Sequence, residues 1–193
     1  GPVDGTYAAD VTIDGGTTQL RIAASTIDGD LTLRSGNASG ITDDGTVTVG
    51  GDLAATTDAS DGVITLNQLA VAGSIALNTH GTGAATVVND HATGIEFAAS
   101  TVGGALSATA TAGHITDSGV LRITGASTFT VAAGQSILLT ESSTFAAVAF
   151  NTSAGVLLDV EINDSNAFEL PTLTVTNDLT VTAGGDITDS GGT

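Results

Sequence analysis

The chain has 193 residues and a formal net charge of −18 at pH 7, with 21 Asp and Glu against three Lys and Arg. Nucleic acids and anionic membrane surfaces bind clustered cations, so this composition argues against both as partners. There is no Cys and no stretch of 18 apolar residues, so we expect neither disulfide bridges nor insertion into a membrane.

Short segments in which apolar and polar residues alternate recur along the whole chain, as expected of β-strands with one buried face. In chain order these segments are residues 11–13, 20–27, 31–33, 47–49, 95–97, 106–108, 121–123, 160–162, 168–175 and 179–181. Residues that favour strands and turns dominate, and no window has the spacing of an amphipathic helix. The sequence therefore predicts an all-β protein with almost no helix.

A long repeat organises these segments. The pentad Ile-Thr-Asp-Asp-Gly at residues 41–45 returns as Ile-Thr-Asp-Ser-Gly at residues 115–119 and 187–191. The repeated block is thus about 73 residues long, and its flanking segments align as well, which is typical of stacked units that share one core. We therefore expect one continuous domain over residues 1–193, made of a partial unit at 1–45 and units at 46–119 and 120–191.

A shorter period lies inside the long one. Polar turns follow strand segments at Asp14, Asp43, Asn67, Asn89, Asp117, Thr140, Asn163 and Asp189. Their spacing predicts a parallel β-solenoid with coils of about 24 residues, three coils to the long repeat, and these polar residues stacked in one turn column. Seven to eight coils, each adding about 4.8 Å, would make a rod about 35 Å long.

Five Phe residues are expected to fill the core: Phe97, Phe129, Phe145, Phe150 and Phe168. The alternative fold is a row of β-sandwich domains. A sandwich usually needs about 100 residues and gives no reason for the shorter period, so the solenoid is favoured.

Two strings resemble the repeats of filamentous-haemagglutinin-like adhesins and related giant bacterial surface or secreted proteins. They are Asn-Asp-Leu-Thr-Val-Thr-Ala-Gly-Gly-Asp-Ile-Thr-Asp-Ser-Gly at residues 177–191 and Phe-Glu-Leu-Pro-Thr-Leu-Thr-Val at residues 168–175. The resemblance implies a single-stranded right-handed parallel β-helix, an extracellular or cell-surface location, and a role as the shaft of an adhesin. It supplies no catalytic residues.

We accordingly expect the chain to be a stretch of a longer protein whose neighbouring solenoid repeats are its first partners. Host or matrix glycans, or other cells, are further candidate partners. Unpaired strand edges at the ends of the stretch would favour end-to-end or lateral self-association.

Acidic turns are the best candidates for a chemical site. Ca²⁺ takes six to eight oxygen ligands, and carboxylates in turns supply them. The candidate ligands are Asp14, Asp28, Asp30, Asp43, Asp44, Asp58 and Asp61. Against this, Asp and Asn also form turns by bonding to their own backbone, and neither EF-hand spacing nor the nine-residue calcium repeat is present. No cofactor is predicted, with Ca²⁺ as the open alternative.

The three histidines, His80, His91 and His114, lie in different phases of the repeat. Ligands of a shared transition metal would have to converge. We therefore expect exposed turn residues and not a metal site.

Three other functions are alternatives to a passive rod. Parallel β-helices include polysaccharide-degrading enzymes, but the acidic pairs here are spread evenly and only three Arg are present, so no enzyme is predicted. An ice-binding face would need Thr in every coil, and the Thr-x-Thr pairs at 46/48, 109/111, 174/176 and 180/182 do not supply it. Glycan binding by the rod surface is the alternative function that we retain, although the chain has a single Tyr and no Trp to anchor a ligand.

Overall fold

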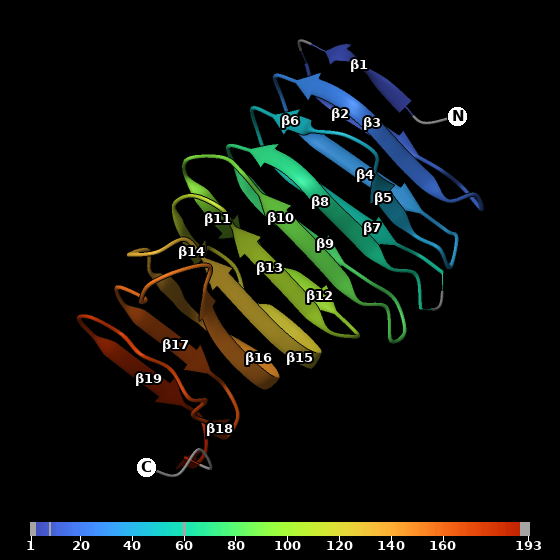
Figure 1. The fold of residues 1–193 in the computed structure, drawn as a ribbon. Coiled ribbons are helices and arrows are strands. Elements are labelled where there is room, and N and C mark those ends of the chain that lie inside the picture. The colour runs from blue at the N-terminus through green and yellow to red at the C-terminus, as the bar shows by residue number, and fades with distance from the viewer. Residues whose placement is uncertain (1–2, 8, 60, 190–193) are drawn as a thin grey trace.

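The computed structural model describes residues 3–7, 9–59 and 61–189, which form one stack of parallel β-strands with no helix in these ranges (Figure 1). The strands are β1 (Val3–Tyr7), β2 (Val11–Asp14), β3 (Leu20–Ile27), β4 (Leu31–Ser35), β5 (Ile41–Asp43), β6 (Val47–Val49), β7 (Leu53–Thr57), β8 (Ile64–Val71), β9 (Ser74–Asn78), β10 (Ala85–Asn89), β11 (Gly94–Phe97), β12 (Ser100–Val102), β13 (Leu106–Ala110), β14 (His114–Asp117), β15 (Leu121–Val131), β16 (Ile137–Thr152), β17 (Val160–Asp164), β18 (Phe168–Glu169), β19 (Leu179–Ala183) and β20 (Ile187–Thr188). All of them belong to one parallel sheet that winds around the rod, except β18 and β20, which pair with each other. The predicted all-β solenoid is thus confirmed.

Each turn of the solenoid is shorter than predicted. Leu31 pairs with Leu53 of the next turn, and Leu53 pairs with Ile75 of the turn after that. The chain completes about nine turns of roughly 21 residues. At about 4.8 Å a turn, the rod is about 43 Å long.

The long sequence repeat does not correspond to a whole number of turns. Three turns on from Ile41 the chain reaches Leu106, by way of Ile64 and Ala85. The second copy of the pentad begins later, at Ile115. The repeat therefore spans about three and a half turns, and successive copies lie at different positions around the rod.

The predicted turn column is wrong for the same reason. Asp43 pairs with Ile22 of β3, whereas Asp117 pairs with Phe97 of β11, so the two aspartates occupy different ladders. Asp14 lies in a third position, opposite Arg34. Corner segments differ in length from turn to turn, so polar residues at similar spacings in sequence do not stack on one another.

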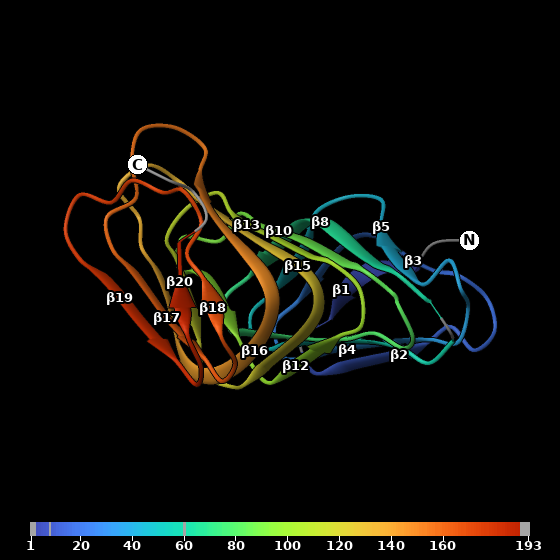
Figure 2. The same ribbon diagram turned by 90° about the horizontal axis from the view of Figure 1, so that it is seen from below.

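The core is one continuous apolar cluster from Leu20 to Phe168. Phe129 lies at the centre of an aromatic group: its ring centroid is 6.2 Å from that of Phe97, 6.0 Å from that of Phe145 and 6.4 Å from that of Phe150. All five Phe are buried, as predicted. Figure 2 shows β15 and β16, which carry three of them, curving around one side of the rod.

Candidate functional site

Two short columns of polar side chains run along the rod and connect successive turns. Each member directly precedes the first apolar residue of a strand. We call the two columns together the axial ladder; its first half is Asp10, Asp30, Asp52 and Ser74, and its second half is His114, Ser136, Asp159 and Asp178. The two halves are not in register, because Ser74 lies opposite Glu96, whereas His114 lies opposite Gly94, which has no side chain.

Side chains in the first half of the axial ladder accept hydrogen bonds from the backbone of the next turn. Asp10 Oδ1 accepts the N–H of Asp30 at 2.9 Å, and Asp30 Oδ1 accepts that of Asp52 at 2.8 Å. Asp52 Oδ1 accepts both the N–H and the hydroxyl of Ser74, at 2.7 and 3.0 Å. Each such bond contributes about 0.5–1.5 kcal/mol. The ladder therefore connects neighbouring turns in addition to the strand pairing.

The same arrangement returns in the second half of the ladder. Nδ1 of His114 accepts the N–H of Ser136 at 2.9 Å, so the neutral imidazole carries its proton on Nε2. Oδ1 of Asp159 accepts the N–H of Asp178 at 3.2 Å, and the hydroxyl of Ser136 donates to Oδ2 of Asp159 at 3.0 Å. His114 is exposed, as predicted, but it is the first residue of β14 and belongs to the ladder.

Glycine precedes the ladder wherever the carboxylate of the previous turn lies closest. A Cβ atom on Gly29, Gly51 or Gly73 would lie 2.3, 2.1 and 2.4 Å from Oδ1 of the ladder aspartate one turn earlier. No side chain fits at such distances, so only Gly is compatible with the ladder here. The Gly-Asp and Gly-Ser pairs of three successive turns, at residues 29–30, 51–52 and 73–74, are thus a signal in the sequence, which reasoning from turn residues missed.

One corner of the rod is locked from inside by a buried amide. Asn89 is completely buried, and its Oδ1 accepts the N–H of Val71 at 2.8 Å. Its Nδ2 donates to the carbonyl oxygens of Val71 and Gly94, at 3.0 and 2.6 Å. The predicted turn residue Asn89 is therefore a structural lock between turns.

The seven aspartates proposed as Ca²⁺ ligands are distributed along the rod. Two of them form ion pairs with arginine. Asp44 pairs with Arg21, and Oδ2 of Asp58 lies 2.9 Å from Nη2 of Arg34. Asp28 lies exposed at the corner between β3 and β4.

The other four accept backbone hydrogen bonds. Asp14 accepts from Gly16 at 2.8 Å, Asp30 from Asp52, Asp43 from Gln68 at 2.7 Å, and Asp61 from Thr82 at 2.8 Å. The hydroxyl and backbone N–H of Thr82 together lower the pKa of Asp61. Across the described residues, no three His, Asp or Glu side chains gather where they could hold a metal ion.

The remaining histidines lie in corners of the rod. His80 is exposed, and its carbonyl oxygen accepts the N–H of Asp61 at 3.0 Å. His91 is half-buried, and its Nδ1 lies 2.8 Å from the hydroxyl oxygen of Thr93. Both are turn residues, as predicted.

The pKa of Asp117 is raised, whereas that of Asp61 is lowered. Asp117 is half-buried at the end of β14, and the loss of hydration raises its pKa. Hydrogen bonds from the N–H groups of Thr140, at 2.7 Å, and Glu141 oppose this rise without cancelling it.

The outer face of the rod carries a row of hydroxyl groups. Thr42 pairs with Thr65, Thr65 with Thr86, Thr86 with Ser107, and Ser107 with Thr128. These five residues are half-exposed and belong to successive turns. The Thr-x-Thr pattern missed this row because its members are separated by a whole turn.

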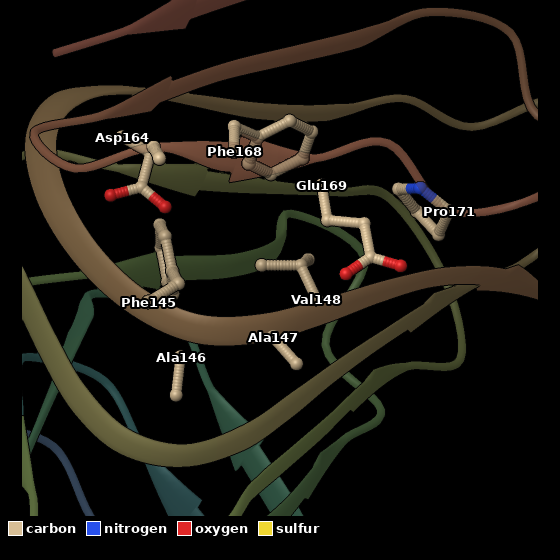
Figure 3. Close-up of a pocket in the computed structure, with 9 residues that line it drawn as sticks. Phe145, Ala146, Ala147, Val148, Asp164, Phe168, Glu169 and Pro171 are labelled. Atoms are coloured by element: carbon tan, nitrogen blue, oxygen red, sulfur yellow. The ribbon is translucent and has the colours of Figure 1, made fainter. Parts of the chain in front are cut away.

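Near the last turns, a cavity of about 160 Å³ opens between β16 and the segment that contains β17 and β18 (Figure 3). The pairing of β16 with β17 ends at Ser143 and Asp164. The next strand, β18, pairs with β20 of the following turn and not with β16. The turns are therefore not joined by a ladder of hydrogen bonds across the cavity.

Most of the residues that line the cavity are apolar, and their backbone and the two acidic residues supply its polar part. Phe168 lies across it from Phe145 and Val148 of β16, with Pro171 at one end. The carboxylates of Asp164 and Glu169 lie on the two sides of Phe168. Asp164 is only 2% exposed, whereas Glu169 is on the surface. In the sequence, Asp164 directly follows the predicted turn residue Asn163, and Pro171 has no backbone N–H to donate to a neighbouring strand.

Comparison with known proteins identifies a repeat family. The family model named Repeats of unknown function (DUF5649) matches residues 8–84, 82–153 and 158–193. No curated protein and no solved structure matches the chain. No helix within the described ranges has the length and apolar character needed to cross a membrane.

Proposed function

The chain belongs to the DUF5649 family of repeats, and we propose that it is a non-catalytic structural rod in a large bacterial cell-surface or secreted protein. The parent protein would be an adhesin of the filamentous-haemagglutinin type. The observation that carries this proposal is the single apolar core, which continues from turn to turn between the first and last parts of the rod.

The rod keeps its two ends apart. Figure 1 places β1 and β19 at opposite ends of the stack. A segment of this kind inserted in a longer protein would hold its neighbours about 43 Å apart, at about 4.8 Å for each turn. Further repeats of the same parent chain would stack on its ends and lengthen the shaft.

Stiffness would come from three layers of contacts between turns. Parallel strand pairing encloses the rod, the apolar cluster fills it, and the axial ladder connects its edge. In stacked repeats, stability is approximately the sum of such nearest-neighbour contacts, so no single turn has to be stable alone.

The acidic surface suits an exposed location. A net charge of −18 keeps copies of the rod apart and solvated, and it disfavours nucleic acid as a partner. Host or matrix glycans, or other cells, would then be contacted by parts of the parent protein that the rod carries outward.

Two measurements test the proposal. Small-angle X-ray scattering of the isolated chain should give a rod about 43 Å long that lengthens by about 4.8 Å for every turn added by repeat duplication. Antibodies against the chain should label intact cells of the source bacterium and lose their target when the cells are treated with protease. Labelling only after the cells are broken open would overturn the surface location, and a length that does not grow with added turns would overturn the rod.

A further inference from the structure

We propose that the cavity between β16 and β18 is a binding site for a small organic ammonium ion, such as the head of an alkylamine. The inference concerns a ligand site on the side of the rod and does not depend on the rod's location or parent protein. Three features of the cavity carry it.

The first feature is a buried carboxylate outside the ion pairs of the described residues. Asp164 is 2% exposed and lines the cavity, and its Oδ1 accepts the N–H of Asn166 at 3.0 Å. The two ion pairs that the described residues form involve Arg21 and Arg34, far from this turn in sequence. The third arginine, Arg122, is exposed on the outward side of β15 and lines a neighbouring hollow that shares Phe145 and Ala146 with this cavity, but no ion pair between described residues joins it to Asp164. A cation bound beside Asp164 would offset the cost of burying its charge.

The second feature is the wall. Phe145 and Phe168 are 4% and 3% exposed, and both border the cavity together with Val148. Aromatic faces attract organic cations, and apolar walls favour an alkyl group over a hydrated metal ion. Glu169 adds a second negative charge at the surface side of the same cavity.

The third feature is size. A volume of about 160 Å³ is close to that of a cavity of about 150 Å³ that holds benzene, so about six non-hydrogen atoms fit. An ammonium group on a short alkyl chain has this volume and this combination of charge and apolar surface. The amine could be a free small molecule or the side chain of a lysine presented by a peptide.

The test uses the whole chain and n-butylammonium as the probe, followed by backbone amide NMR at constant ionic strength. We expect saturable shifts centred on Ala146, Ala147 and Glu169, and no comparable shifts with 1-butanol, which has the same shape without the charge. N-acetyl-lysine amide serves as the second probe. Binding of both probes points to a lysine side chain, and binding of butylammonium alone points to a free amine.

Variants separate the cavity from the general negative charge. Asp164→Asn keeps an oxygen for the N–H of Asn166 but removes the charge, and it should weaken butylammonium binding about tenfold or more. Val148→Phe should weaken it by filling the cavity, without touching the charge of Asp164. Glu161→Gln, on the outer side of β17, removes the same charge elsewhere and should leave the affinity unchanged.

Circular dichroism spectra and melting temperatures show whether each variant is folded. If Asp164→Asn does not fold, Val148→Phe still tests whether the cavity is the binding site. The proposal is overturned if the shifts do not saturate, if 1-butanol produces the same shifts, or if Glu161→Gln weakens binding as much as Asp164→Asn does.

Discussion

Replacement of Phe129 by alanine should destabilise the rod more than any other single truncation in the aromatic group. Phe129 is completely buried in β15, and its ring meets three others, in Phe97, Phe145 and Phe150. Its backbone pairs with Ala108 of β13 on one side and with Phe150 of β16 on the other. Truncation therefore weakens two successive interfaces between turns at once.

The expected loss follows from burial and ring contacts. Phe-to-Ala substitutions in cores cost about 3–5 kcal/mol, because contacts are lost and a cavity remains. Edge-to-face and stacked ring pairs add about 0.5–1.5 kcal/mol each, which places Phe129→Ala near the upper end of that range. For a chain of this length, each kcal/mol lowers the melting temperature by about 2–4 °C, so we expect a fall of about 10 °C or more.

Urea unfolding followed by far-ultraviolet circular dichroism gives the free energy of unfolding, and a thermal melt gives the change in melting temperature. Thr130→Ala is the matched control, because Thr130 is the next residue of β15 and points outward. Its effect should stay within about 0.5 kcal/mol. A loss of less than about 1 kcal/mol in Phe129→Ala would refute the reasoning that this ring joins adjacent turns.

The polar contacts give three further predictions. Gly51→Ala should destabilise the rod by about 1–3 kcal/mol, measured by urea unfolding, because its Cβ would lie 2.1 Å from Oδ1 of Asp30; an unchanged midpoint would argue against the axial ladder. Burial raises the pKa of Asp117 above its ordinary value of 3.8, so the stability it contributes is present at lower pH and is lost as pH rises through the raised value. In melts at a series of pH values, the stability of Asp117→Asn relative to the wild type should therefore increase as the pH rises above 3.8, and an increase confined to lower pH would contradict the sign. Ca²⁺ should raise the melting temperature no more than Mg²⁺ does, because six of the seven candidate aspartates already bond to arginine or to backbone N–H groups; a rise of several degrees specific to Ca²⁺ would reverse this expectation.

The architecture of the rod was predictable because it depends on local patterns. Alternation such as Leu-Thr-Leu at residues 31–33 places two side chains inward whatever the neighbouring turn contains, and Leu31 and Leu33 are both 1% exposed. The burial of the five Phe follows from the same rule. A dense succession of such short segments, with a repeat too long for one strand pair, leaves a parallel solenoid as the fold that buries them all.

Which residues meet was decided only by the tertiary structure. Leu106, and not Ile115, lies three turns beyond Ile41, because corners of unequal length accumulate differences that the long repeat does not reveal. The predicted turn column failed for this reason.

The axial ladder and the cavity depend on the same accumulated register. Asp30 meets the backbone of Asp52 only because the chain returns to the same edge one turn later, and the carboxylate fits only because Gly51 has no side chain. The cavity lies where the pairing of β16 with β17 has ended and β18 pairs with β20. The sequence by itself determined which side chains face inward, since alternation acts over a few residues. The stacking of one turn on another determined where the polar and charged side chains lie, since that depends on the length of every corner before them.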